Sequence, residues 1–142
     1  MNVLLKTVLT LFLITTASAC AAQQSVTDEQ LTRSDYNEVE EIRMPEMSGD
    51  LSPTALATAL LEQPAEEECL QWKQSKISRE ADGVTAVVYT IMGLCDDSLG
   101  GIEHRYDLIF EDSGYKIDWA GERYYCRRTD PSGWIEPGNY CL

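Results

Sequence analysis

The feature that most constrains the fold is the spacing of two cysteines around a turn. Cys69 and Cys95 are equally distant from Asp82, which lies in the turn sequence Ala-Asp-Gly. In an antiparallel hairpin the numbers of directly opposed residues have a constant sum, so a turn centred on Asp82 places these two cysteines opposite each other. Opposed Cα atoms at non-hydrogen-bonded positions are about 4.5 Å apart, within disulfide range. The spacing therefore predicts a Cys69–Cys95 disulfide across a hairpin.

The remaining pair, Cys126 and Cys141, is assigned to a second disulfide by elimination among the three pairings that four cysteines allow. This bridge closes a loop of about fifteen residues over the tail 127–142 and is worth roughly 3 kcal/mol in the chain-entropy treatment. The alternative is four reduced, buried thiols, which suits an exported protein poorly.

The segments on both sides of these turns have β character. Residues 70–79 and 84–94 flank the Asp82 turn, and the second segment is rich in β-branched and aromatic residues. Residues 103–111 and 115–119 flank an Asp-Ser-Gly turn, and both alternate with period two. In the first of these strands Tyr106, Leu108 and Phe110 share one face. In the second, Tyr115, Ile117 and Trp119 are again two residues apart and are expected to share a face.

One helix precedes the strands, at residues 53–63. Ser52 is a natural N-cap, Pro53 suits the first helical position, and Pro64 ends the run. Leu56 and Leu60 share an apolar stripe that must be buried. We therefore predict an α+β fold: one short helix followed by an antiparallel sheet of about four strands, stapled by disulfides, in a single domain over residues 51–142.

The first 19 residues have the pattern of a secretory signal peptide. Lys6 is the only charge before Asp28, residues 8–14 are mostly apolar, and small residues follow. The alternative is a membrane anchor, but the apolar run is far shorter than the ~20 residues that cross a bilayer. The chain is expected to be exported.

Cys20 follows the small residues. Ala17-Ser18-Ala19-Cys20 resembles a bacterial lipobox, with Ala17 where that family usually has leucine. The resemblance implies that Cys20 is lipidated, and Ala21 after it implies the periplasm-facing outer membrane in a Gram-negative cell. Ordinary cleavage after Ala19 or Ala21, giving a secreted soluble protein, stays open. Five cysteines is an odd number, and either lipidation of Cys20 or its removal leaves four to pair.

Residues 20–50 are expected to form a flexible tether after the lipidated cysteine. Residues 27–50 hold eight acids, two arginines and few large apolar side chains. Such a segment buries too little apolar surface to offset its ordering entropy. A short helix that docks on a partner is the alternative.

The charge and the motifs of the chain restrict the classes of function that it can have. With 24 Asp and Glu against 11 Lys and Arg, the net charge of −13 argues against binding nucleic acid or an anionic membrane surface. The chain contains no G-x-S-x-G, phosphate loop, H-E-x-x-H or C-x-x-C. The single histidine, His104, shares parity with Tyr106 and is expected at the rim of the buried face, in a structural role. Asp96, Asp97 and Glu103 lack the ligand spacing of a calcium loop, so we predict no metal and no cofactor.

Aromatic and basic side chains gather toward the C terminus. They form a candidate surface for an envelope protein, peptide or glycan. The alternative is that the arginines pair with nearby acids or stack on tyrosines. The candidate binding residues are Arg123, Arg127, Arg128, Trp134 and Tyr140.

Residues 106–119, a strand, an acidic-glycine turn and an aromatic-Lys-Ile strand, resemble the closing hairpin of NTF2-like and cystatin-like exported domains, and the resemblance covers residues 51–122. Together with Cys20 and the cysteine-bounded tail, the chain resembles a small bacterial lipoprotein. The leading hypothesis is a non-enzymatic binding or interaction module of the cell envelope. The alternative, which the resemblance implies, is a small NTF2-like enzyme in which Asp107 or Asp118 acts as acid or base from a pocket between helix and sheet.

Overall fold

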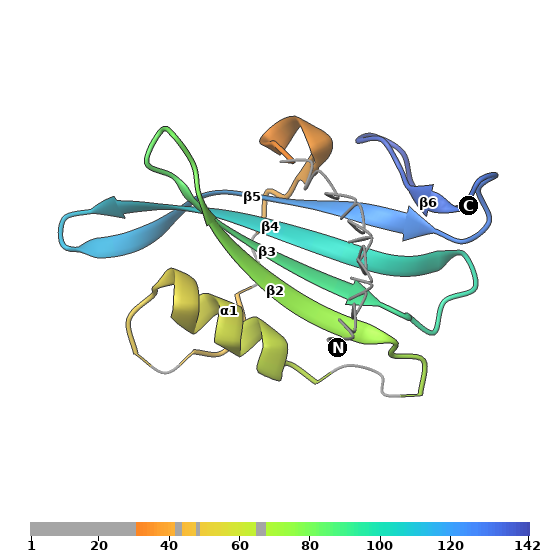
Figure 1. The fold of residues 1–142 in the computed structure, drawn as a ribbon, viewed down its shortest axis with the longest axis horizontal. Coiled ribbons are helices and arrows are strands. Elements are labelled where there is room, and N and C mark those ends of the chain that lie inside the picture. Colours follow the sequence, from red (N-terminus) through yellow and green to blue (C-terminus); the bar gives the residue numbers. More distant parts are fainter. Residues whose placement is uncertain (1–30, 42–43, 48, 65–67) are drawn as a thin grey trace, which may run out of the picture.

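A computed structural model describes residues 31–41, 44–47, 49–64 and 68–142, so the expected signal peptide and Cys20 lie outside the described residues. The strands form one antiparallel sheet in the order β1-β5-β4-β3-β2, and β6 also pairs with β5 (Figure 1). The elements are η1 (Arg33–Asp35), β1 (Asn37–Glu38), α1 (Pro53–Glu62), β2 (Trp72–Arg79), β3 (Thr85–Met92), β4 (Leu99–Glu111), β5 (Gly114–Cys126) and β6 (Gly133–Trp134). The predicted α+β arrangement is confirmed, with six strands instead of about four.

The predicted helix forms where its capping residues place it. The Ser52 hydroxyl accepts a hydrogen bond from the Ala55 N–H at 3.1 Å, and Pro53 occupies the first turn. Leu56, Ala57 and Leu60 are buried against the sheet, where α1 packs on β2 and β3. The hydrophobic core thus lies between the helix on one side and one face of the sheet on the other.

The first hairpin has the predicted register. Ile77 lies opposite Val87, as a turn centred on Asp82 requires. The Cys69–Cys95 disulfide is present, with its Cα atoms 5.2 Å apart. Turn chemistry and strand alternation were therefore sufficient to place two strands and one bridge.

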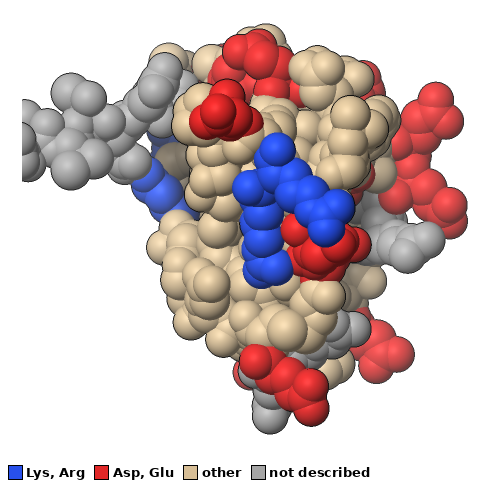
Figure 2. Space-filling view, turned by 90° about the vertical axis from the view of Figure 1, so that its right-hand side faces the viewer, with Lys and Arg blue, Asp and Glu red and all other residues tan. Residues whose placement is uncertain are grey.

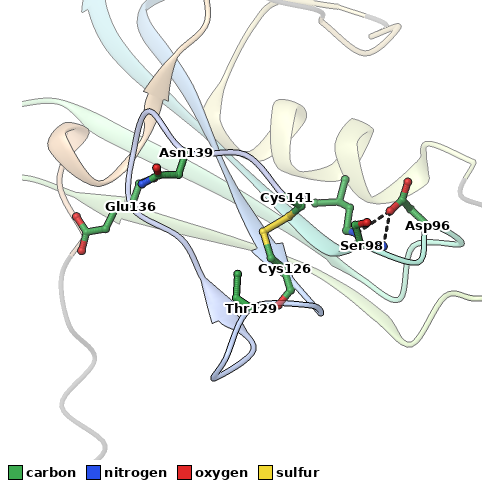
Figure 3. Close-up of a disulfide and its surroundings, with 8 residues drawn as sticks. Asp96, Ser98, Cys126, Thr129, Glu136, Asn139 and Cys141 are labelled. Carbon is green, nitrogen blue, oxygen red and sulfur yellow. Dashed lines mark hydrogen bonds between the residues drawn. A yellow bond between two sulfur atoms is a disulfide. The ribbon is translucent and has the colours of Figure 1, made fainter.

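The second predicted disulfide, Cys126–Cys141, is also present and holds the tail against the end of the sheet (Figure 3). Its Cα atoms are 5.3 Å apart, and Cys126 is buried at the end of β5. Beside it, the Asp96 carboxylate accepts hydrogen bonds from the N–H groups of Ser98 and Leu99 at 2.8 and 2.7 Å. This turn leads into β4, which begins at Leu99.

A β-bulge in β5 changes the predicted face of one aromatic residue. Leu108 pairs with Ile117, but Asp107 pairs with Trp119, which leaves Asp118 as the extra residue. The insertion reverses the alternation, so Trp119 lies on the face opposite Ile117. The prediction that both share one face was wrong.

Part of the predicted tether is a strap across the sheet, defined here as residues 31–39. It contains η1 and β1, and β1 pairs with β5 through Asn37 opposite Glu122. Tyr36 is 4% exposed and packs edge-on against Trp119, and Arg33 lies over the same indole ring. Gly121 makes this close approach possible, because a Cβ there would lie 2.3 Å from the Trp119 ring. For these residues the expectation of a solvated linker was wrong.

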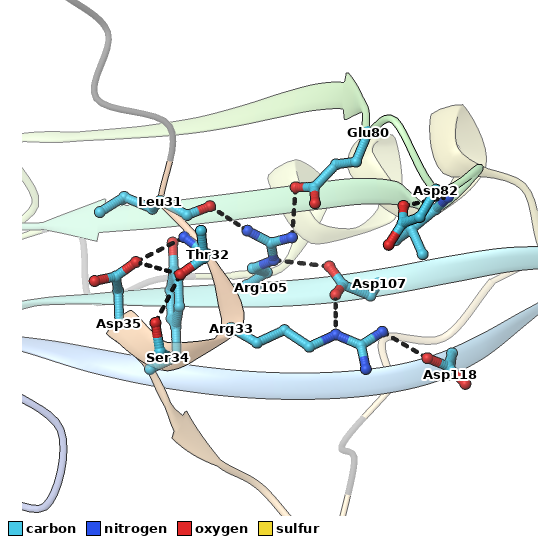
Figure 4. Close-up of polar contacts among 12 residues, drawn as sticks. Leu31, Thr32, Arg33, Ser34, Asp35, Glu80, Asp82, Arg105, Asp107 and Asp118 are labelled. Carbon is cyan, nitrogen blue, oxygen red and sulfur yellow. Dashed lines mark hydrogen bonds and ion pairs between the residues drawn. The ribbon is translucent and has the colours of Figure 1, made fainter.

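Ion pairs hold the strap on the face of the sheet opposite α1. In Figure 4 the helix lies behind the sheet and the strap in front of it. Arg33 bridges Asp107 at 2.6 Å and Asp118 at 2.5 Å. Asp107 also pairs with Arg105 at 2.7 Å, and Arg105 pairs with Glu80 at 2.5 Å and donates to the carbonyl of Leu31. Because Arg105 and Asp107 are almost fully buried, each charge needs these partners.

Among the described residues, no helix has the length and apolar character needed to cross a bilayer. The two disulfides indicate an oxidising, exported environment.

Candidate functional site

A cleft lies between α1 and the half of the sheet that the helix does not cover. A ten-residue helix is about 15 Å long and packs mainly on β2 and β3, so the helix-side face of β4 and β5 stays partly open. The cleft has a volume of about 610 Å³, within the usual range for small-molecule sites. Its lining residues are Val39, Glu41, Leu60, Gln63, Tyr89, Ile91, His104, Tyr106, Ala120, Gly121 and Glu122. We call this the helix-side cleft.

Three rings form one wall of the helix-side cleft. His104 lies directly opposite Tyr89 across the β3–β4 pair, and Tyr106 follows two residues later on the same face. The imidazole centroid is 6.5 Å from that of Tyr89 and 6.4 Å from that of Tyr106, with interplanar angles of 16° and 29°. Tyr89 and Tyr106 are buried, so the half-buried imidazole of His104 supplies most of the exposed ring surface of this wall.

The hydroxyl of Tyr89 is the unusual polar group of the cleft. Tyr89 is 1% exposed, and its hydroxyl has no hydrogen-bond partner among the described residues. A buried hydroxyl without a partner costs roughly 1–3 kcal/mol, and native proteins seldom retain one without a reason. A bound molecule with a polar group is one such reason.

A carboxylate and an imidazole lie side by side in the same cleft. Glu122 Oε2 is 3.7 Å from His104 Nδ1, and Glu122 Oε1 accepts a hydrogen bond from the Tyr124 hydroxyl. Burial lowers the pKa of His104, and this effect exceeds the opposing influence of Glu122 and Glu103. His104 is therefore neutral at neutral pH.

Burial also raises the pKa of Tyr106 to about 12, with a further contribution from the Glu122 charge. The phenols of the cleft thus remain protonated at neutral pH. The charged residues that line the cleft, within the described chain, are Glu41 and Glu122, and no lysine or arginine joins them. The cleft is aromatic and acidic.

The acids expected to act from such a pocket lie elsewhere. Asp107 is buried on the strap side between Arg33 and Arg105, and Asp118 pairs with Arg33. Neither lines the helix-side cleft. Glu41 and Glu122 are the carboxylates that do. The sequence did not predict Glu122 there, because the bulge at Asp118 reverses the face of every later residue in β5. His104 does lie at the rim of the helix-packed face, 30% exposed, as its parity predicted.

The candidate binding residues Arg123 and Trp134 lie together on the strap side of the sheet. Arg123 pairs with Glu103 at 2.8 Å, and its guanidinium is 4.5 Å from the centroid of the Trp134 ring. Glu103 also accepts hydrogen bonds from Tyr36 and Thr90, both at 2.7 Å. Arg123 is thus held in a satisfied network, as the structural alternative expected.

Arg127 and Arg128 lie at the opposite end of β5 from the turn at residues 112–113. Arg127 donates to the carbonyls of Asp96 and Leu94 at 2.7 and 2.9 Å, and Arg128 pairs with Asp97. Figure 2 shows this end of the molecule, where a small basic group lies against acidic side chains. Tyr140, 68% exposed, packs against Tyr124. These contacts give each predicted binding residue a partner within the chain.

A second cleft, of about 600 Å³, lies on the strap side and includes Arg105, Arg123 and Glu103. The buried charges of these three residues are paired, in contrast to the unpartnered Tyr89 hydroxyl. The described part of the chain has no group of three or more His, Cys, Asp or Glu side chains placed to hold a metal ion.

No protein-family model, curated protein or solved structure matches the chain.

Proposed function

We propose that this chain is an exported binding module of the bacterial cell envelope and that it holds a small ligand in the helix-side cleft. The observation that carries the proposal is Tyr89, a lining residue of the cleft whose buried hydroxyl has no described partner. A ligand that supplies a hydrogen bond removes the cost of leaving that hydroxyl unpaired. The disulfides support export.

A thermal-shift screen of the processed protein, purified in nonionic detergent, tests the binding proposal. A ligand of the cleft raises the melting temperature of the wild type, and Tyr89→Phe removes most of that increase. Tyr125→Phe is the matched control, because Tyr125 packs against Trp134 on the other face of the sheet. If no compound gives a Tyr89-dependent shift, or if both variants respond alike, the cleft is not the binding site.

The proposed membrane attachment rests on Cys20 and has its own test. We expect cells fed a clickable fatty acid to label the wild type and not Cys20→Ala. Equal labelling of the two proteins, or a wild type recovered wholly in the soluble fraction, argues for ordinary signal cleavage.

One observation favours an enzyme as the second candidate. Glu122 and the neutral imidazole of His104 are adjacent in the cleft, and such a pair suits general acid–base catalysis. Incubation with a ligand found in the screen separates the two functions. A binding module returns the ligand unchanged, whereas an enzyme forms a product and loses that activity in both Glu122→Gln and His104→Gln.

A further inference from the structure

The helix-side cleft has the features of a site for an organic cation. Its charged lining residues are carboxylates, whereas the strap-side cleft is lined by Lys76, Arg79, Arg105 and Arg123 as well as acids. The two faces of the sheet thus differ in the sign of charge that they offer. On a charge basis the helix-side cleft favours a cationic ligand over an anionic one.

The aromatic wall supplies a second, independent attraction for a cation. The rings of Tyr89, His104 and Tyr106 lie on one face beside the cleft, and tyrosine rings attract a cation held near them. His104 does not oppose this, because its imidazole is neutral at neutral pH. Lys73, near the helix end of the cleft, donates to the Gln63 carbonyl at 3.0 Å and is not a lining residue.

Hydrogen-bond acceptors for an ammonium group are also present. An ammonium carries three N–H donors and accepts nothing. The Glu122 carboxylate is held by Tyr124, and the Tyr89 hydroxyl is 1% exposed and lacks a partner. A hydroxyl accepts from such a donor, so the unpaired group and the carboxylate fit the same class of ligand.

We propose that the helix-side cleft binds a primary amine with an apolar or aromatic body, whose ammonium group pairs with Glu122 and donates to the Tyr89 hydroxyl. The apolar body packs on Leu60, Ile91 and Ala120, which line the same cleft. This inference rests on the proposed function and adds the chemical class of the ligand.

Three probes of similar shape test the charge requirement: phenethylamine, the neutral 2-phenylethanol and the anionic 3-phenylpropionate. Binding to the processed wild-type protein is measured by ligand-detected NMR titration at neutral pH. We expect phenethylamine to bind at least tenfold more tightly than 2-phenylethanol, and 3-phenylpropionate more weakly than either. Equal affinities for the three probes, or no binding of the amine, overturn the assignment.

Glu122→Gln tests the ion pair directly, and its amide oxygen still accepts the Tyr124 hydrogen bond. We expect this variant to lose at least tenfold in affinity for phenethylamine and to bind 2-phenylethanol as the wild type does. Glu136→Gln, in the exposed tail, is the matched control and keeps wild-type affinity. A neutral or anionic compound whose affinity falls in Tyr89→Phe and is unchanged in Glu122→Gln would show that the ligand is not an amine. That result would leave the proposed function intact.

Discussion

Replacing Tyr89 with phenylalanine should stabilise the ligand-free protein. The Tyr89 side chain is 1% exposed, and its hydroxyl has no described hydrogen-bond partner. Removing it abolishes a desolvation cost of roughly 1–3 kcal/mol and leaves the ring packing in place. We expect the free energy of unfolding to rise by about 1 kcal/mol and the melting temperature by about 4 °C.

Tyr36→Phe is the matched comparison, because Tyr36 is also buried but its hydroxyl donates to Glu103 at 2.7 Å. In Tyr36→Phe the substitution removes a hydrogen bond to a buried carboxylate, so the free energy of unfolding should fall by about 1.5–3 kcal/mol. Chemical denaturation of both variants and the wild type measures the two changes. A loss of stability in Tyr89→Phe as large as that in Tyr36→Phe would show that the Tyr89 hydroxyl is satisfied, for example by a buried water, and would refute the reasoning.

Two further predictions concern the tail and the histidine. Changing Cys126 and Cys141 to serine should lower the free energy of unfolding by about 3 kcal/mol and expose the tail to protease, while the first hairpin stays folded. Circular dichroism with limited proteolysis checks this, and loss of the hairpin would contradict it. Because the pKa of His104 is lowered in the folded protein, the unfolded chain binds a proton at a higher pH than the folded protein does. The free energy of unfolding should therefore fall as pH drops below about 6.5 toward the pKa of His104 in the folded state. His104→Gln should flatten that part of the stability–pH curve, and an unchanged curve would show that His104 does not contribute.

The alkaline side offers a separate measurement. Tyr106 keeps its proton to about pH 12 in the folded protein, whereas the unfolded chain releases it near pH 10. Above about pH 10 the folded state therefore binds more protons, and stability should decline as pH rises. Absorbance titration at the tyrosinate band should show Tyr106→Phe losing a late-titrating group; a normal early transition for that tyrosine would contradict its burial in the cleft.

Local chemistry in the sequence was enough to determine the helix, the first hairpin and both bridges. Ser52 and Pro53 define a helix start through their own backbone geometry. The turn at Asp82 sets the register of β2 and β3, and Cys69 and Cys95 follow from it by counting. The Cys126–Cys141 bridge then follows by elimination, and the other decisions depend on residues close in sequence or on the two-residue period of a strand. The same period placed His104 at the rim of the helix-packed face.

Only the tertiary structure decided which side of the sheet the later residues of β5 occupy. Counting by twos from Ile117 puts Trp119 and Arg123 toward the helix, but the bulge at Asp118 turns them to the strap side and brings Glu122 into the cleft. The strap itself carries too few apolar residues to be predicted as ordered. It is held by Arg33 and Tyr36, whose partners Asp107 and Glu103 are 74 and 67 residues away. A bulge and long-range ion pairs depend on what packs across the sheet, and no local pattern encodes them.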